Sequence, residues 1–283
     1  MPRELRKKRK EFIVRGIVAG MGLAAATTLI TAVPAHAAAP KNPIAVVKKQ
    51  MAAGKGVTFV ERVTLIEGQK RKILLRRSGT YQLNASGIAA SDITSSFGVK
   101  ASDLGLHADP AMGLTVNEPE RSITIGKSIY LSGSVWDSLI PKGETWYKTS
   151  QPWPGGFFPY VLHGGFAGLY GQPMNVVVEP AALKKLLRNA SPVPGGYVGT
   201  ITVGWLYATS PSFKARLRGE RPSPEVSKNI VRWKLTVDSK GLPTRMVSTM
   251  PARFFGVSNT KDAVLRFDTR YNAWSATFSI TPP

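Results

Sequence analysis

The chain contains many stretches in which apolar and polar side chains alternate at every second residue, and no other feature constrains its fold as much. Within residues 57–67, one face holds Val57, Phe59, Val63 and Leu65, and the other holds Thr58, Arg62 and Thr64. Such alternation predicts a β-strand with one buried face. Further strands are predicted over residues 71–77, 121–132, 145–148, 197–207, 229–237, 242–250, 263–268 and 274–280, with shorter candidates at 80–83 and 87–89.

Turn signals divide these strands, and few helices separate them. Gly126 marks a hairpin turn or a bulge within 121–132, and residues 238–241 suit a compact hairpin turn. Residues 79–116 give a weaker signal, and the Ser-Asp steps at 91–92 and 102–103 suit turns. Helices are predicted over residues 43–53, which Gly54 ends, and in the second half of residues 152–189.

The order of these elements shows no βαβ rhythm, which favours an antiparallel sheet in an α+β fold. We predict a strongly curved sheet, a half-barrel of about nine or ten strands, with helices packed on its concave face. The predicted domains are a signal peptide over residues 1–37 and a single domain over residues 38–283.

The N-terminus has the three parts of a secretory signal peptide. A basic head precedes an apolar run over residues 16–33, and Ala35-His36-Ala37 supplies an A-x-A cleavage site. The alternative is an uncleaved membrane anchor, because the run is just long enough to span a bilayer. Arg9-Lys10 is similar to a twin-arginine signal with its second arginine replaced, so the export route stays open. We expect a secreted, extracytoplasmic protein cleaved near Ala37.

The chain is strongly basic and lacks cysteine. Its formal net charge is +21, and seven of its 38 basic residues lie in the predicted signal peptide, so the excess belongs to the mature part. A surface this positive attracts anionic membrane surfaces or acidic wall polymers. Nucleic acid is not expected, because the cations are scattered and no recognition motif is present. Without cysteine, disulfides, thiolate metal sites and N-terminal lipid attachment are excluded.

Residues 152–189 interrupt the strands and must lie across a face or an end of the sheet. Their first half mixes glycines with large rings, which suits a cover over an apolar cleft. Their second half predicts an amphipathic helix. Core packing is the alternative for every ring, and it is favoured for Trp205, Trp233 and Phe267. The predicted ligand-binding residues come from the cover, the helix and the sheet: Phe157, Phe158, Phe166, Tyr170, Leu183, Leu186, Leu187, Ile201, Val203 and Trp205.

Catalytic motifs are largely missing from the chain. His163-Gly164-Gly165 is similar to the oxyanion loop of some esterases, but no G-x-S-x-G occurs, so His163 is interpreted as a loop residue near a cleft mouth. No metal-binding spacing is present, and no cofactor or metal is expected. Most carboxylates suit turns and caps. Glu61 alone lies on the apolar side of a predicted strand; it either orients a ligand hydroxyl or, as we favour, pairs with Arg77 or another cation.

Several phrases resemble the secreted and lipid-anchored actinobacterial proteins of LolA-like fold, the LppX and LprG type. They are residues 48–59 (KKQMAAGKGVTF), 78–81 (SGTY), 87–92 (GIAASD), 130–133 (YLSG), 141–148 (PKGETWYK), 241–245 (GLPTR) and 268–274 (DTRYNAW). The resemblance implies a half-barrel whose apolar cavity accepts acyl chains. This chain departs from many relatives because Ala37-Ala38 stands where they carry a lipobox cysteine.

We therefore expect a non-enzymatic carrier of a lipid or lipid-linked ligand, acting as a monomer. The alternative is a basic envelope-associated module that binds wall polyanions and holds no lipid. A polysaccharide or ester hydrolase is a third possibility, which would need a specific carboxylate or His163.

Overall fold

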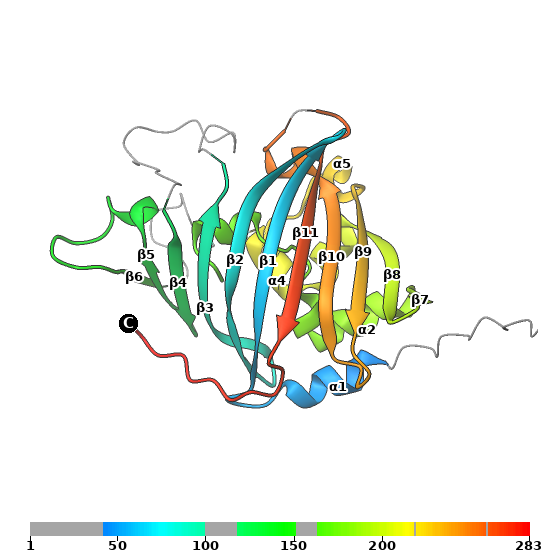
Figure 1. The fold of residues 1–283 in the computed structure, drawn as a ribbon, viewed down its shortest axis with the longest axis horizontal. Coiled ribbons are helices and arrows are strands. Elements are labelled where there is room, and N and C mark those ends of the chain that lie inside the picture. The colour runs from blue at the N-terminus through cyan, green and yellow to red at the C-terminus, as the bar shows by residue number, and fades with distance from the viewer. Residues whose placement is uncertain (1–41, 100–117, 151–162, 218, 259) are drawn as a thin grey trace, which may run out of the picture. The chain divides into compact units, whose positions relative to one another are not determined.

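The computed structural model describes residues 42–99, 118–150, 163–217, 219–258 and 260–283. All described residues belong to one compact unit, 37–283. Within that unit, eleven strands form one antiparallel sheet in the order β6-β5-β4-β3-β2-β1-β11-β10-β9-β8-β7. The sheet is open, and β6 and β7 are its two edges (Figure 1).

The strands of the first half of the chain occupy one side of the sheet and those of the second half occupy the other. The first six are β1 (Gly56–Glu67), β2 (Lys70–Asn84), β3 (Gly87–Phe97), β4 (Glu120–Ile125), β5 (Ser128–Ser132) and β6 (Tyr147–Ser150). The remaining five are β7 (Ser191–Val193), β8 (Gly196–Thr202), β9 (Ile230–Val237), β10 (Pro243–Pro251) and β11 (Val264–Asn272). The β1–β11 pair joins the two halves.

Short helices accompany the sheet, and α2, α4 and α5 lie on the same side of it in Figure 1. The α-helices are α1 (Pro43–Gln50), α2 (Pro180–Arg188), α3 (Val203–Thr209), α4 (Pro211–Arg216) and α5 (Pro224–Ser227). The 3₁₀ helices are η3 (Ser134–Trp136), η4 (Phe166–Tyr170), η5 (Asn175–Val178) and η6 (Ala252–Phe255). Among the described residues, no helix is both long enough and apolar enough to span a membrane.

The core lies against one face of the sheet, which we call the covered face. Register places Phe59 opposite Tyr271 and Val63 opposite Phe267 on this face, and all four are buried. Burial of such side chains is the main favourable term in folding, about 1.5–3 kcal/mol for each large apolar residue. The opposite face, which we call the outer face, carries residues such as Arg62 and Arg270, which are exposed.

The connection between β6 and β7 determines what covers the sheet. Because these strands are opposite edges, the chain between them must cross a face, and its described part, residues 163–190, lies on the covered face. For its described part, residues 163–189, this confirms the prediction that the segment over 152–189 lies across the sheet. It also confirms an antiparallel sheet with helices on one face, although there are eleven strands instead of nine or ten in the described part.

The predicted elements needed four corrections. The strand predicted over 197–207 ends at Thr202, whose hydroxyl accepts the N–H of Trp205 at 3.1 Å and begins α3, so Val203 and Trp205 are helical. Residues 210–227, for which no helix is predicted, contain α4 and α5, capped by Ser210 and Ser223, each followed by proline.

The other two corrections concern a strand that is missing and one that is longer. Residues 274–280 form a single bridge from Thr277 to Lys55 instead of a strand, after positive φ at Ala273 and Ser275. The Ser91-Asp92 step lies inside β3 and not in a turn. Gly126 lies in the hairpin turn between β4 and β5, so of the two predicted alternatives the hairpin turn is confirmed and the bulge is excluded.

Candidate functional site

The segment on the covered face fills it with large apolar side chains. Phe166 and Tyr170 of η4 contact Phe97 of β3, with ring centroids 5.8 and 6.0 Å apart. Further along, Met174 and all of Val176, Val177 and Val178 are buried. The rings of Phe166 and Tyr170 are part of the hydrophobic core.

A buried carboxylate on β4 fixes the start of this segment. Glu120 accepts hydrogen bonds from the backbone N–H groups of Phe166 at 2.5 Å and Ala167 at 2.9 Å, and from Trp136 Nε1 at 2.8 Å. A Cβ at Gly165, where φ is +61°, would collide with this carboxylate. The glycine therefore allows the negative charge to approach the N-terminus of η4. Burial raises the pKa of Glu120 to about 7, against the opposing effect of these hydrogen bonds.

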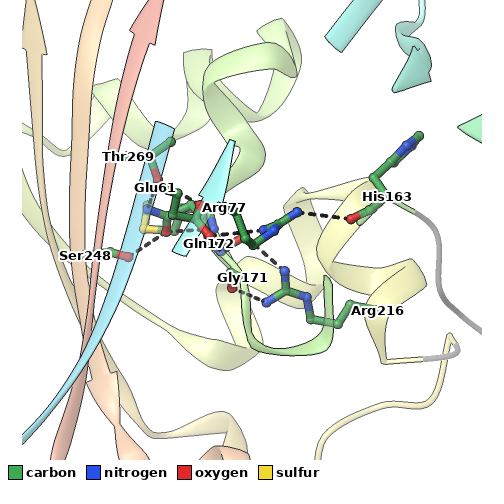
Figure 2. Close-up of polar contacts among 9 residues, drawn as sticks. Glu61, Arg77, His163, Gly171, Gln172, Arg216, Ser248 and Thr269 are labelled. Atoms are coloured by element: carbon green, nitrogen blue, oxygen red, sulfur yellow. Dashed lines mark hydrogen bonds and ion pairs between the residues drawn. The ribbon is translucent and has the colours of Figure 1, made fainter. Parts of the chain in front are cut away.

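A buried ion pair fixes the middle of the segment. Arg77 Nη1 lies 3.1 Å from Glu61 Oε1, and both side chains are almost fully buried. The Glu61 carboxylate also accepts the Gln172 N–H at 3.1 Å and the Thr269 hydroxyl at 3.0 Å. Figure 2 shows Arg77 between Glu61 and the carbonyl of His163, which accepts from Nη2 at 3.2 Å. The predicted pairing of Glu61 with Arg77 is confirmed.

Hydrogen bonds extend this network across β10, β11 and α4. The Gln172 side chain donates to the Thr269 hydroxyl at 3.2 Å and accepts from the Ser248 hydroxyl at 2.6 Å. Arg216 donates to the carbonyls of Gly171 at 2.9 Å and Gln172 at 3.0 Å (Figure 2). A Cβ at Gly171 would collide with Arg77, so this glycine also allows a close approach of a buried charge. The carboxylates of Glu61 and Glu120 both accept hydrogen bonds from donors within the protein, so we assign them a structural role.

His163 lies at the end of the network. Its Nδ1 is 2.8 Å from the Ser91 hydroxyl, and its ring meets the edge of Tyr81. Burial, and then the Arg77 guanidinium, lower the pKa of His163 to about 4, so the ring is neutral at pH 7. Ser91 was predicted to lie in a turn, but its place in β3 lets its hydroxyl reach this ring.

Beside His163, a cavity of about 670 Å³ opens between α1, the β2–β3 turn, α2 and α4. We call it the α1–α2 cavity. Its apolar lining comes mainly from Ile44, Met51, Ile88, Pro180, Ala181, Ala182, Pro211 and Ala215. Its polar lining includes His163, Glu179, Thr209 and Ser212, together with the exposed cations Lys48 and Lys184. His163 thus lies at a cavity, as its interpretation as a cleft-mouth residue predicted.

Eight of the ten predicted ligand-binding residues lie in the described part of the chain, away from the α1–α2 cavity. Phe157 and Phe158 fall outside the described residues. Phe166, Tyr170, Leu183, Leu186 and Val203 are buried in the core, and Leu187, Ile201 and Trp205 are partly buried against it. None of these eight lines the α1–α2 cavity.

The residues that do line the α1–α2 cavity carried only weak sequence signals. Ile44 and Met51 share the apolar side of the predicted first helix, whose pattern requires only a packing surface. Ala181 and Ala182 are too small to indicate anything but helix. The absence of a large side chain at these positions is what leaves space beside α2.

Glu179 connects the cavity wall to α4. Its carboxylate accepts the Ser210 hydroxyl at 2.7 Å and the Ser212 N–H at 2.9 Å. These bonds satisfy an N–H group in the first turn of α4. They therefore hold the α2 and α4 walls of the cavity at a fixed separation.

No protein-family model matches the chain, and neither does any curated protein. Three solved structures with which it aligns are a LolA superfamily protein from Nitrosomonas europaea, a DUF1329 family protein from Desulfovibrio piger and a putative outer membrane lipoprotein-sorting protein domain from Vibrio parahaemolyticus. Their identities are 7%, 8% and 11%, and their TM-scores are 0.28, 0.30 and 0.26. The alignments cover 85%, 84% and 81% of this chain and 98%, 95% and 91% of the others. TM-scores this low establish neither a family nor a function.

Proposed function

We propose that this protein is an exported, non-enzymatic carrier that holds the apolar tail of an amphiphile in the α1–α2 cavity. The cavity carries the proposal: its volume of about 670 Å³ lies within the range of small-molecule sites, and its lining is mainly apolar with a few polar groups. Burial of a tail of about twelve methylenes would provide on the order of 10 kcal/mol of transfer free energy before binding losses. The signal peptide predicted from the N-terminal sequence supports an extracytoplasmic carrier.

The two lysines of the cavity suggest the polarity of the ligand. Lys48 on α1 and Lys184 on α2 are exposed, while the apolar lining lies between their helices. An anionic headgroup beside the lysines would leave the tail among Ile44, Met51 and Ile88. The preferred cargo is therefore a fatty acid or another amphiphile with an acidic head. Leu183 and Leu186 would support this site indirectly, by packing α2 onto the core.

Denaturing extraction and mass spectrometry of the protein purified from its native host test the proposal. We expect close to one amphiphile per chain, and binding of a fluorescent fatty acid to the extracted and refolded protein. Recovery of no amphiphile, together with no probe binding, would contradict the carrier. Release of a lipid-free protein from cells by moderate salt would favour the polyanion-binding module instead, because salt screens exposed charge contacts.

Ala181→Trp is expected to reduce amphiphile recovery and probe affinity at least tenfold. Ala181 is exposed at the cavity on α2, so an indole there would occupy the space of the tail without overpacking the core. The measurement is probe titration by fluorescence, with amphiphile recovery by mass spectrometry.

Thr200→Trp on the outer face of β8 is the matched control, since Thr200 is exposed and lies outside the cavity lining. It should leave both readouts unchanged. Equal binding by the parent and Ala181→Trp would show that the tail lies somewhere else.

A further inference from the structure

The outer face of the sheet carries a second hollow, which the proposed function does not use. Its volume is about 470 Å³, and it extends over β1, β2, β3 and β11. Side chains of the outer face that line it include Val60, Arg62, Arg76, Ser78, Thr94, Ser96, Asp268 and Arg270. The three arginines are exposed and rise from neighbouring strands, so the sheet itself fixes their spacing.

Two acidic residues line this hollow, Glu61 and Asp268, and both are already paired, Glu61 with Arg77. Asp268 binds the Arg245 guanidinium through two contacts, and Arg266 Nη2 lies 3.6 Å from the same carboxylate. These contacts lower the pKa of Asp268, led by the hydrogen bond from Arg245. In the part of the chain that the structure describes, no carboxylate forms an ion pair with Arg62, Arg76 or Arg270.

Strand register makes the excess charge costly for folding. Arg62 lies directly opposite Arg76, and Arg245 lies directly opposite Arg270. Like charges in directly opposed positions destabilise a sheet. Asp268 attracts Arg245, Arg266 and Arg270 and lies directly opposite Arg62, but this one carboxylate cannot offset the repulsion among all of these arginines. An external anion in the hollow would offset it.

The composition of the hollow favours the phosphate headgroups of a lipid surface over a soluble polyanion. Arginine forks match phosphate oxygens in two-point contacts, and the hydroxyls of Ser78 and Thr94 lie at the same hollow. Val60 is 48% exposed among these groups. An apolar side chain beside cations suits the boundary between headgroups and acyl chains, whereas a hydrated soluble polymer gains nothing from it.

We propose that the outer face docks on membrane surfaces rich in anionic phospholipid, with Arg62, Arg76 and Arg270 contacting headgroup phosphates. Arg232 and Lys234 of β9 are exposed on the same face and extend the positive surface. This docking does not depend on the proposed cargo, because the α1–α2 cavity shares no lining residue with the outer hollow.

Co-sedimentation of the exported protein with vesicles tests the docking. Phosphatidylglycerol vesicles at low salt are compared with phosphatidylcholine vesicles at the same salt. The parent should bind the phosphatidylglycerol vesicles and should not bind the phosphatidylcholine vesicles. The Arg62→Gln/Arg76→Gln/Arg270→Gln variant should bind the phosphatidylglycerol vesicles roughly 100-fold more weakly, at about fivefold for each cation near an anionic surface. Arg-to-Lys replacement at the same three positions should retain most of the binding, because the charges remain.

Lys185→Gln/Arg188→Gln/Lys228→Gln is the matched control, because it removes three exposed cations that lie outside the hollow. It should weaken vesicle binding less than fivefold. Thermal unfolding should show the outer-face variant folded and at least as stable as the parent, since the substitution removes like-charge repulsion.

Three results would overturn the docking surface. One is an equal loss of vesicle binding in both triple variants, which would indicate diffuse charge attraction. Another is no vesicle binding by the parent. The third is binding of soluble polyphosphate without vesicle binding, which would assign the hollow to a soluble polyanion. Loss of amphiphile recovery alone would contradict the carrier function and leave the docking intact.

Discussion

Arg77→Met is expected to lower the free energy of unfolding by about 3–5 kcal/mol, because it leaves the Glu61 carboxylate buried without its cation. The substitution also removes the donor to the His163 carbonyl, 3.2 Å away. Both lost contacts hold the segment that covers the sheet. The measurement is denaturant unfolding at pH 7, followed by tryptophan fluorescence. The variant should lower the denaturant concentration at the midpoint and leave the slope of the free energy of unfolding against denaturant unchanged.

Arg76→Met is the control, because Arg76 lies on the same strand but points to the exposed outer face. It should change stability by no more than about 0.5 kcal/mol. The Glu61→Leu/Arg77→Met double variant should be more stable than Arg77→Met alone, since it removes the unpaired charge. Equal effects at positions 76 and 77, or a double variant less stable than the single, would contradict a structural ion pair.

Alternation along the sequence was sufficient to predict the sheet and one part of its buried network. Glu61 breaks the apolar pattern of β1, and a carboxylate on a buried face needs a cation, which pointed to Arg77. Residues 197–207 show where this reasoning fails. An alternating pattern continues past Thr202, but the Thr202 hydroxyl caps a helix there. Local hydrogen bonding outweighed the two-residue period.

The segment over the covered face shows what could not be predicted from the sequence. Its glycines suggested mobility, whereas Gly165 and Gly171 leave room for Glu120 and Arg77. Those partners lie about 45 and 94 positions away along the chain, and strand register alone brings them there. The α1–α2 cavity was missed for a similar reason. It is lined by side chains from four separate elements, and no local pattern records their proximity.

The stability of Glu120→Gln relative to the parent is expected to rise by on the order of 3 kcal/mol between pH 4.5 and pH 7.5. In the folded parent, burial raises the pKa of Glu120 from 4.5 to about 7, so the folded state holds a proton that the unfolded state releases. The contribution of Glu120 to stability is therefore greatest at low pH and falls as pH rises through this range. Glutamine is neutral at every pH, so the Glu120→Gln variant does not lose this contribution to stability as pH rises.

The parent must be compared with the Glu120→Gln variant because the contribution of His163 to stability depends on pH in the opposite direction to that of Glu120. The pKa of His163 is lowered from 6.5 to about 4, so its contribution to stability falls as pH falls below 6.5. The two dependences oppose each other between pH 4.5 and pH 6.5, and the parent alone should show a nearly flat profile there. In the difference between parent and Glu120→Gln, the His163 contribution cancels.

Urea unfolding of both proteins at half-unit pH intervals gives this difference directly. Glu144→Gln is the control for the change of residue type, since Glu144 is exposed and lies outside the buried network. A difference for Glu120→Gln that stays constant with pH would show that folding does not raise the pKa of Glu120. The donors from Phe166, Ala167 and Trp136 would then balance burial, and the covered-face segment would be held by a carboxylate that is charged at pH 7.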